Sequence, residues 1–131
     1  MILMTSFAKR PHDMIAYSVA RWQPAHENLT EKKYMAPKKV KFEDAEDFYK
    51  KYIDLMTTGQ RWYQIQKFVD REQKLCRDVA LCCWCTISQQ RLKGYNTIMC
   101  HTIPLGWLLK ESGLMVKLDE EREEFGIPMR V

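Results

Sequence analysis

The apolar run at residues 79–85 constrains the fold of this chain more than any other stretch. It consists of Val-Ala-Leu-Cys-Cys-Trp-Cys, so the side chains that alternate between the two faces of a strand are apolar on both faces. Such a strand is typical of the centre of a covered sheet. A polar loop with Gly94 follows, and then Cys100 and His101 stand directly before a predicted helix. The stretch 78–113 therefore predicts a strand, a loop and a helix start that organise the rest of the chain.

The predicted helix begins at Thr102 and ends at Gly113. Threonine is a favoured N-cap and proline is tolerated in the first turn, where Pro104 stands. Open α/β sheets bind ligands where a strand ends and a helix begins, because the free N–H groups and the helix dipole attract anions. The sequence therefore predicts a crevice that is shared by the cysteines after the strand and by Cys100 and His101.

Further strands and helices are predicted on both sides of this stretch. We expect strands at 1–7 and 14–20, the second also buried on both faces. Residues 114–118 are predicted to be either an edge strand or chain that returns to the sheet. Apolar stripes predict helices at 44–58 and 61–76, the second with Leu75 in its stripe, and a short acidic helix at 119–126. The basic stretch 24–42 shows no period and is predicted to be a loop. This order favours an α/β fold: a small, mostly parallel or mixed sheet with helices packed on its faces.

Length and charge narrow the class of protein. The 131 residues predict a single domain, with a core at about 1–118 and an acidic segment at 119–131. No apolar stretch reaches the roughly 20 residues of a membrane span, and residues 1–4 are too short for a signal peptide, so a cytoplasmic location is predicted. The net charge of +4 is too small to indicate nucleic-acid binding. A homo-oligomer is compatible with these features.

The five cysteines indicate free thiols rather than disulfides, because their number is odd and no secretion signal precedes them. One alternative is a zinc site formed by Cys83, Cys85, Cys100 and His101, although the spacing departs from the usual pair of zinc knuckles. A second is a cysteine enzyme with Cys100, His101 and Cys85 as candidate catalytic residues, since a helix start and a histidine lower a thiol pKa. No carboxylate partner for the histidine can be assigned, so the presence of catalysis stays open.

The first hypothesis is a small-molecule binding protein without a cofactor. Basic and aromatic side chains are predicted to gather at the strand ends, where they suit an anionic, nucleotide-like ligand that would be bound or sequestered rather than converted. The candidate ligand-binding residues are Ser6, Lys9, Arg21, Trp22, Tyr34, Trp84, Cys85, His101 and Thr102.

Several motifs resemble domain-of-unknown-function family 488 of bacterial and phage proteins. The matching positions over residues 5–112 are Ser18, Arg21 and Pro24, then Tyr34, Ala36 and Pro37, and finally Cys100 with His101. The resemblance implies an α/β fold and, through the phage members, a role in host–phage conflict; it implies no reaction. Thr102 stands where the family usually has arginine, so any anion-binding role of that arginine is expected to be absent here or to have moved to Arg21 or a lysine of the 24–42 loop.

Overall fold

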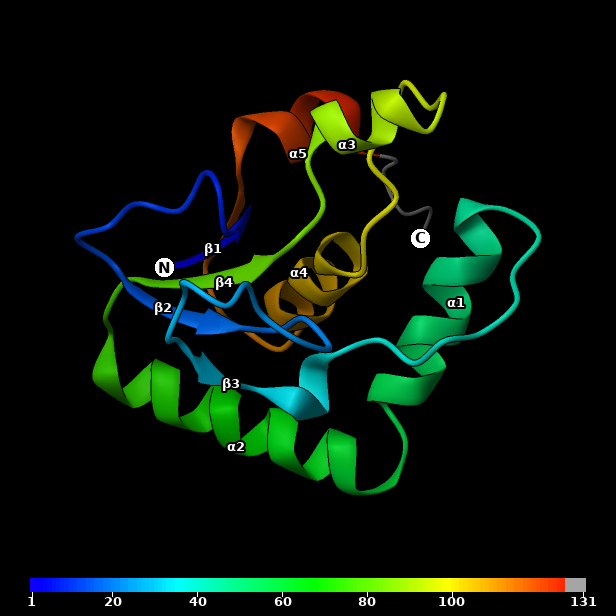
Figure 1. Ribbon diagram of the computed structural model, residues 1–131. Helices are drawn as coiled ribbons and strands as arrows, with labels where there is room; N and C mark the ends of the chain where they lie inside the picture. Colours follow the sequence, from blue (N-terminus) through cyan, green and yellow to red (C-terminus); the bar gives the residue numbers. More distant parts are fainter. Residues whose placement is uncertain (127–131) are drawn as a thin grey trace.

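A five-stranded parallel sheet forms the centre of the protein in the computed structural model, which describes residues 1–126. The strand order is β3-β2-β4-β1-β5 (Figure 1). β4 lies in the middle, as the apolar run predicts, and the predicted α/β class is confirmed. The strands are β1 (Ile2–Ser6), β2 (Ile15–Ser18), β3 (Thr30–Glu31), β4 (Val79–Cys83) and β5 (Val116–Leu118).

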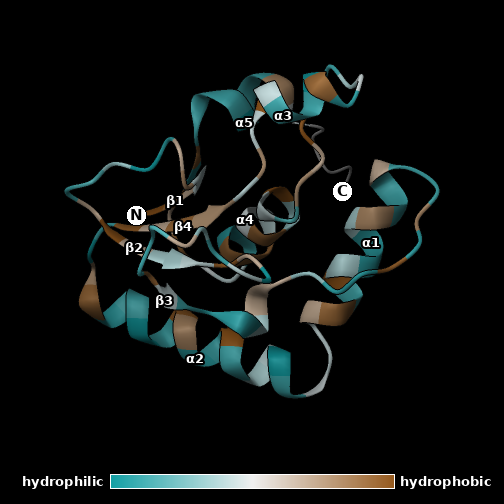
Figure 2. Cartoon of the chain, in the orientation of Figure 1, coloured by the Kyte–Doolittle hydropathy of each residue, from teal (hydrophilic) through white to brown (hydrophobic). Residues whose placement is uncertain are grey.

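The two central strands, β1 and β4, are buried along their whole length. They pair in register from Ile2 opposite Val79 to Ser6 opposite Cys83, and both are mostly brown in Figure 2. The expectation that β2 is buried on both faces is wrong for Ile15, which is 45% exposed. The edge strand β3 pairs only with Tyr17 and Ser18, so among the described residues no strand lies beside Ile15 on that side.

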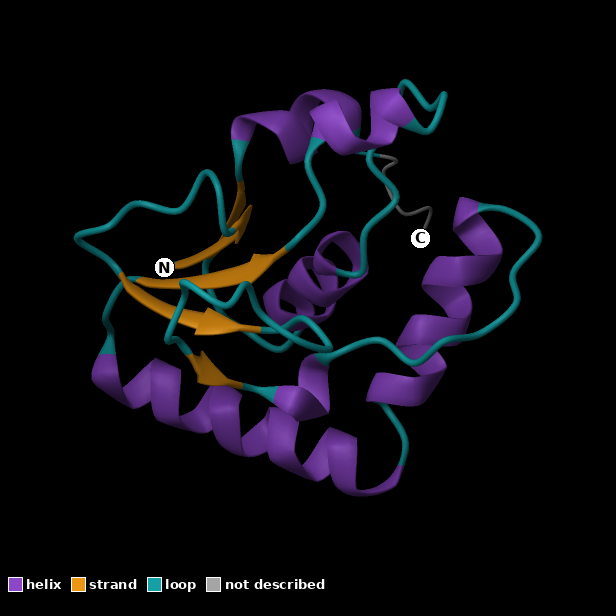
Figure 3. Cartoon of the chain, viewed as in Figure 1, coloured by secondary structure: helices purple, strands orange, loops and turns teal. Residues whose placement is uncertain are grey.

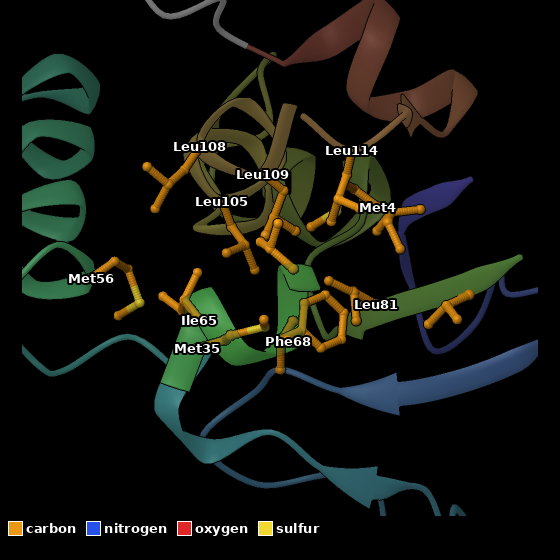
Figure 4. Close-up of a cluster of buried hydrophobic side chains, with 14 of the residues drawn as sticks. Met4, Met35, Met56, Ile65, Phe68, Leu81, Leu105, Leu108, Leu109 and Leu114 are labelled. Atoms are coloured by element: carbon orange, nitrogen blue, oxygen red, sulfur yellow. The ribbon is translucent and has the colours of Figure 1, made fainter. Parts of the chain in front are cut away.

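Two helices, α2 (Gly59–Leu75) and α4 (Thr102–Glu111), lie on one face of the sheet, and α1 (Ala45–Met56) packs against both of them. Their apolar residues meet those of β1 and β4 in one cluster, in which Phe68, Leu105 and Leu109 surround Met4 and Leu81 (Figure 4). The opposite face carries Leu3, Ala80 and Cys82 and is covered by loop residues that include Phe7 and Ala20. The sheet is therefore covered by helices on one side and by loops on the other, as Figure 3 shows by colour.

The predicted ends of the helices are confirmed to within two residues. One residue of the predicted apolar stripes, Leu75, is not buried. Asp44 caps α1 through its side chain, which accepts from Asp47 N, and Gly59 begins α2 with φ +63°. Leu75 was predicted to pack in the stripe of α2, but it is 46% exposed because the helix ends there and Cys76 turns into the left-handed conformation. No helix among the described residues is long and apolar enough to cross a membrane.

The predicted loop 24–42 is more ordered than its composition suggests. It contains β3 and a short 3-10 helix, η1 (Lys33–Met35). Arg61 of α2 donates from Nη1 to the carbonyls of Tyr34 and Ala36, at 2.9 and 2.7 Å, and the Tyr52 hydroxyl donates to the Met35 carbonyl at 2.7 Å. These contacts attach the middle of the loop to the helices.

Two short helices follow the carboxyl ends of strands. They are α3 (Ile87–Leu92), which comes after β4, and α5 (Glu120–Phe125), which comes after β5. Both lie at the top of Figure 1, beyond the ends of the strand arrows. Their position brings the predicted acidic segment next to the residues that follow β4. Residues 127–131 of that segment lie outside the described residues.

Candidate functional site: a buried cysteine cluster

Three cysteines meet where β4 ends and α4 begins. The Sγ atoms of Cys83, Cys85 and Cys100 all lie within 4.8 Å of one another, and those of Cys83 and Cys100 are 3.1 Å apart. Cys83 is the last residue of β4, and Cys85 follows in the loop with its sulfur toward the same cluster. The structure thus brings together three of the four residues of the predicted zinc set.

The fourth residue, His101, contacts the cluster only through its neighbour. Its Nε2 lies 2.8 Å from the Val19 carbonyl, and its Nδ1 lies 3.8 Å from Cys100 Sγ. Because a carbonyl only accepts hydrogen bonds, Nε2 carries a proton, and Nδ1 is the ring atom that faces the sulfur. His101 is also the N-cap residue of α4, so the prediction of Thr102 as the N-cap is wrong.

Arg122 completes the cluster, and the sequence analysis missed it. Its side chain is completely buried, at 1% exposure. Nη2 donates to Cys83 Sγ at 2.8 Å and to the Cys85 carbonyl at 2.9 Å, while Nε donates to the Thr102 hydroxyl at 2.8 Å. Its one signal in the sequence is that it is the only basic residue among the acidic residues 119–124. A charged residue in such a run is ordinarily expected at the surface.

Asp119 balances the charge of Arg122. Its Oδ2 accepts from Arg122 Nη1 at 2.9 Å and from the Thr5 hydroxyl at 2.8 Å, and its Oδ1 accepts from the Arg122 backbone N–H. The carboxylate therefore joins β1 to the start of α5 and holds the guanidinium against the cysteines. All three nitrogens of the guanidinium have partners, as a buried charge requires.

The start of α4 faces the sulfur of Cys100. The Thr102 backbone N–H and hydroxyl both lie within hydrogen-bonding range of Cys100 Sγ, at 3.5 and 3.1 Å. Thr102 itself is completely buried. The N–H group at the start of α4 therefore faces the sulfur of Cys100, whereas the sequence predicted a bound anion in this position.

The three thiols differ in pKa because they form hydrogen bonds with one another. Burial opposes ionisation of Cys100, but hydrogen bonds from Cys83 and Cys85 and the nearby His101 hold its pKa well below the ordinary value. Burial and the bond to Cys100 raise the pKa of Cys83 to about 12. The pKa of Cys85 is also raised, by its bonds to Cys100 and Cys83 and by burial. The cluster therefore favours a single thiolate that the other two thiols stabilise.

The other predicted ligand-binding residues fall into separate places. Trp22, Trp84 and Cys85 line one pocket of about 520 Å³, in which Trp84 Nε1 donates to the Trp22 carbonyl at 2.7 Å. Arg21 stacks on Trp22, with its guanidinium carbon 5.4 Å from the ring centroid. Tyr34 lies in a different pocket, next to α2.

Ser6 and Lys9 form a turn after β1. The buried Ser6 hydroxyl accepts from the Lys9 backbone N–H at 3.2 Å, and the Lys9 side chain is exposed. The neighbouring Arg10 pairs with Glu27 at 3.0 Å. The basic residues at the strand ends therefore do not converge on one point with Thr102.

A scan against protein-family models gives no match to this chain, and searches of curated proteins and of solved structures give none either. The resemblance to family 488 stays a prediction.

Proposed function

We propose that this protein binds a divalent metal ion that favours sulfur, zinc in the first place, through Cys83, Cys85 and Cys100. The observation that carries the proposal is the convergence of their Sγ atoms within 4.8 Å of one another. With Zn–S bonds of about 2.3 Å, a tetrahedral ion separates its sulfur ligands by about 3.8 Å. The separation of 3.1 Å between Cys83 and Cys100 would have to widen by less than about 1 Å, which side-chain rotation can supply.

The groups around the cysteines suit three metal-bound thiolates. Three thiolates on a divalent ion carry a net negative charge, and the buried guanidinium of Arg122, 2.8 Å from Cys83 Sγ, compensates it. The N–H and hydroxyl groups of Thr102 at Cys100 stabilise the sulfur in the same way. Hydrogen bonds of this kind orient metal ligands and tune their affinity.

The described residues offer three ligands, and a tetrahedral zinc ion takes four. The remaining position would be filled by water or by an exogenous ligand, as in zinc sites that act on substrates. Cys85 belongs both to the cluster and to the lining of the pocket with Trp22 and Trp84. A ligand that enters this pocket would therefore approach the ion from the side of Cys85.

The test is the metal content of protein purified without chelator in a reducing buffer, before and after refilling with zinc or cobalt. We expect one ion per chain and, with cobalt, a thiolate-to-metal charge-transfer band. Cys85→Ser and Cys100→Ser should both lose the ion. Cys76→Ser is the matched control, because Cys76 is exposed and lies outside the cluster.

Two results would overturn this proposal. One is a wild-type protein that takes up no ion after refilling. The other is a metal content that Cys85→Ser leaves unchanged while circular dichroism shows a native fold. Because Cys85 is only partly buried, this variant tests the site without opening the core. Thr102→Val, which removes the hydroxyl at Cys100, should weaken metal binding about 10- to 100-fold.

A second candidate function, binding of an anionic nucleotide-like ligand, is supported by the pocket with Trp22 and Trp84. Its volume of about 520 Å³ falls in the range of roughly 300–1,000 Å³ that is typical of small-molecule sites. The two indoles can stack on a base, and Lys93 adds one positive charge to the lining. If the resemblance to family 488 holds, the protein could sequester such a ligand for a phage or its host.

Tryptophan fluorescence tests this candidate directly. Titration with a nucleoside diphosphate should quench the emission of the wild type, and Trp22→Ala, which removes a side chain that is 61% exposed, should weaken the binding at little cost to the fold. Trp107→Phe is the control at a tryptophan outside this pocket. Equal binding by Trp22→Ala and the wild type would exclude this pocket as the ligand site.

A further inference from the structure

A second pocket lies between the β2–β3 edge of the sheet and α2, on the side of the molecule away from α3 and α5 (Figure 1). Its volume is about 210 Å³. The side chains that give it its character are Tyr17, Lys32, Tyr34, Lys67, Arg71 and Glu72. None of them contributes to the cysteine cluster, so an inference about this pocket does not rest on the proposed metal site.

The pocket has a surplus of positive charge. Within residues 1–126, Lys32, Lys67 and Arg71 form no salt bridge. Glu72 is the one acidic residue of the lining, and Arg77 from outside the pocket occupies both of its oxygens, at 3.1 and 3.0 Å. Three cations thus share a concave surface whose single carboxylate is already neutralised.

One side of the pocket, with Lys32 and Tyr34, is held by contacts with the rest of the protein, whereas Lys67 and Arg71 are exposed and the Lys67 ammonium lies 4.7 Å from the centroid of the Tyr63 ring. The Lys32 ammonium lies 4.6 Å from the centroid of the Tyr17 ring, and the Tyr17 hydroxyl accepts from Arg77 at 2.8 Å. Partial burial, followed by the charge of Arg71, lowers the pKa of Lys32, although Glu72 opposes this change. The turn that carries Tyr34 is held by Arg61. The side of the pocket with Lys32 and Tyr34 is therefore in place before any ligand arrives, which reduces the entropy cost of binding there.

We propose that this pocket binds the phosphate end of a small organic phosphate, and that a diphosphate suits its three cations best. Its volume of about 210 Å³ is below the roughly 300 Å³ at which pockets begin to enclose whole drug-sized ligands. The phosphate groups would lie between Lys32, Lys67 and Arg71, and the rest of the ligand would lie outside, against the ring of Tyr34. Charge-assisted hydrogen bonds to phosphate oxygens are strong and match both lysine and arginine donors.

Isothermal titration calorimetry with pyrophosphate at low ionic strength tests the proposal. The wild type should bind one pyrophosphate per chain at this site, and Arg71→Gln and Lys67→Gln should each weaken binding about tenfold or more. Lys50→Gln is the matched control, since it removes the same charge from an exposed lysine of α1 that pairs with Glu46 at 3.9 Å. Its affinity should stay within about twofold of the wild type.

Glu72→Gln should change pyrophosphate affinity in the opposite direction. It removes the negative charge from the pocket, and its amide oxygen can still accept from Arg77, so it should tighten binding. Equal weakening in Lys50→Gln and Arg71→Gln would overturn the proposal, because binding would then reflect only the overall charge. A wild type that does not bind pyrophosphate would overturn it as well.

The source of the phosphate can be read from two further ligands. A nucleoside diphosphate that binds more tightly than pyrophosphate, and that loses this advantage in Tyr34→Ala, would identify a nucleotide as the natural type of ligand. Equal affinities would identify the diphosphate group alone. A nucleoside without phosphate that binds as well as the diphosphate, with its affinity unchanged in Arg71→Gln, would contradict the proposal. Trp22→Ala separates this pocket from the tryptophan pocket, because it should leave pyrophosphate binding unchanged.

Discussion

The cysteine cluster differs in charge compensation from the pocket with Lys32, Lys67 and Arg71, which we call the basic pocket. In the cluster, every nitrogen of the buried Arg122 guanidinium has a partner, and Asp119 supplies the compensating charge. In the basic pocket, Lys32, Lys67 and Arg71 share one surface without a carboxylate partner in the described part of the chain. The difference follows from burial, because an uncompensated charge is costly inside a protein and costs little where water can reach it.

This comparison teaches which region contributes to stability and which is free to serve a ligand. A substitution in the cluster should change the free energy of unfolding, because it leaves buried partners unsatisfied. A substitution in the pocket should change ligand affinity and leave the fold unaffected. The three predictions below test this division, beginning with the largest effect.

Arg122→Ala should destabilise the protein by about 3–5 kcal/mol, since it removes the buried guanidinium that pairs with Asp119 and donates to the Thr102 hydroxyl and to Cys83 Sγ. Arg71→Ala also removes an arginine, but an exposed one, and should change stability by no more than about 0.5 kcal/mol. Urea unfolding of both variants checks the pair. Similar losses in the two variants would show that the cluster has no special role in stability.

Tyr52→Phe should cost about 1–2 kcal/mol, because the buried hydroxyl of Tyr52 donates to the Met35 carbonyl at 2.7 Å. Within residues 1–126, the buried hydroxyl of Tyr49 has no hydrogen bond of normal geometry, so Tyr49→Phe should cause no loss of stability. Both side chains lie on α1 near Cys100 and His101. Thermal unfolding of the two variants therefore compares a satisfied with an unsatisfied buried hydroxyl, and a larger loss for Tyr49→Phe would contradict the prediction.

Stability should decline as the pH rises above about 10. Burial raises the pKa of Tyr34 to about 12 and holds the pKa of Tyr52 well above its ordinary value. The unfolded chain releases these protons near pH 10 while the native protein retains them, so alkali favours unfolding. Urea midpoints measured between pH 8 and pH 11 should fall less steeply in Tyr52→Phe and in Tyr34→Phe than in the wild type, because each variant lacks one of these retained protons. Parallel slopes in both variants and the wild type would refute this assignment.

Much of the fold could be predicted because the strand and helix periods are local. The run from Val79 to Cys83 is apolar on both faces, and the structure places it in the centre of the sheet. The same method failed at Ile15, where exposure depends on the length of the neighbouring strand, and at Leu75, where it depends on the position of the helix end. Neither property is contained in the pattern of apolar residues.

The candidate site could be predicted in part. Cys83, Cys85 and Cys100 were expected to share one crevice, because a strand end and a helix start meet at the same edge of a parallel sheet. Tyr34 was expected in the same place as Trp22 and Trp84, but it lies in the basic pocket instead. Its position depends on the path of the 24–42 loop along α2, and that path follows from the contacts of Arg61 and Tyr52.

The amino-acid sequence by itself indicated the α/β class and the central buried strand, since both follow from the apolar pattern along strands and helices. It also indicated that the three cysteines meet, since a strand end and a helix start share one edge of a parallel sheet. Only the tertiary structure decided the environment of those cysteines. Because β5 pairs with β1, the acidic segment is brought to the carboxyl end of the sheet, where Arg122 can reach Cys83. Burial of a charged side chain depends on partners that lie far away in the chain, and no local pattern of residues contains that information.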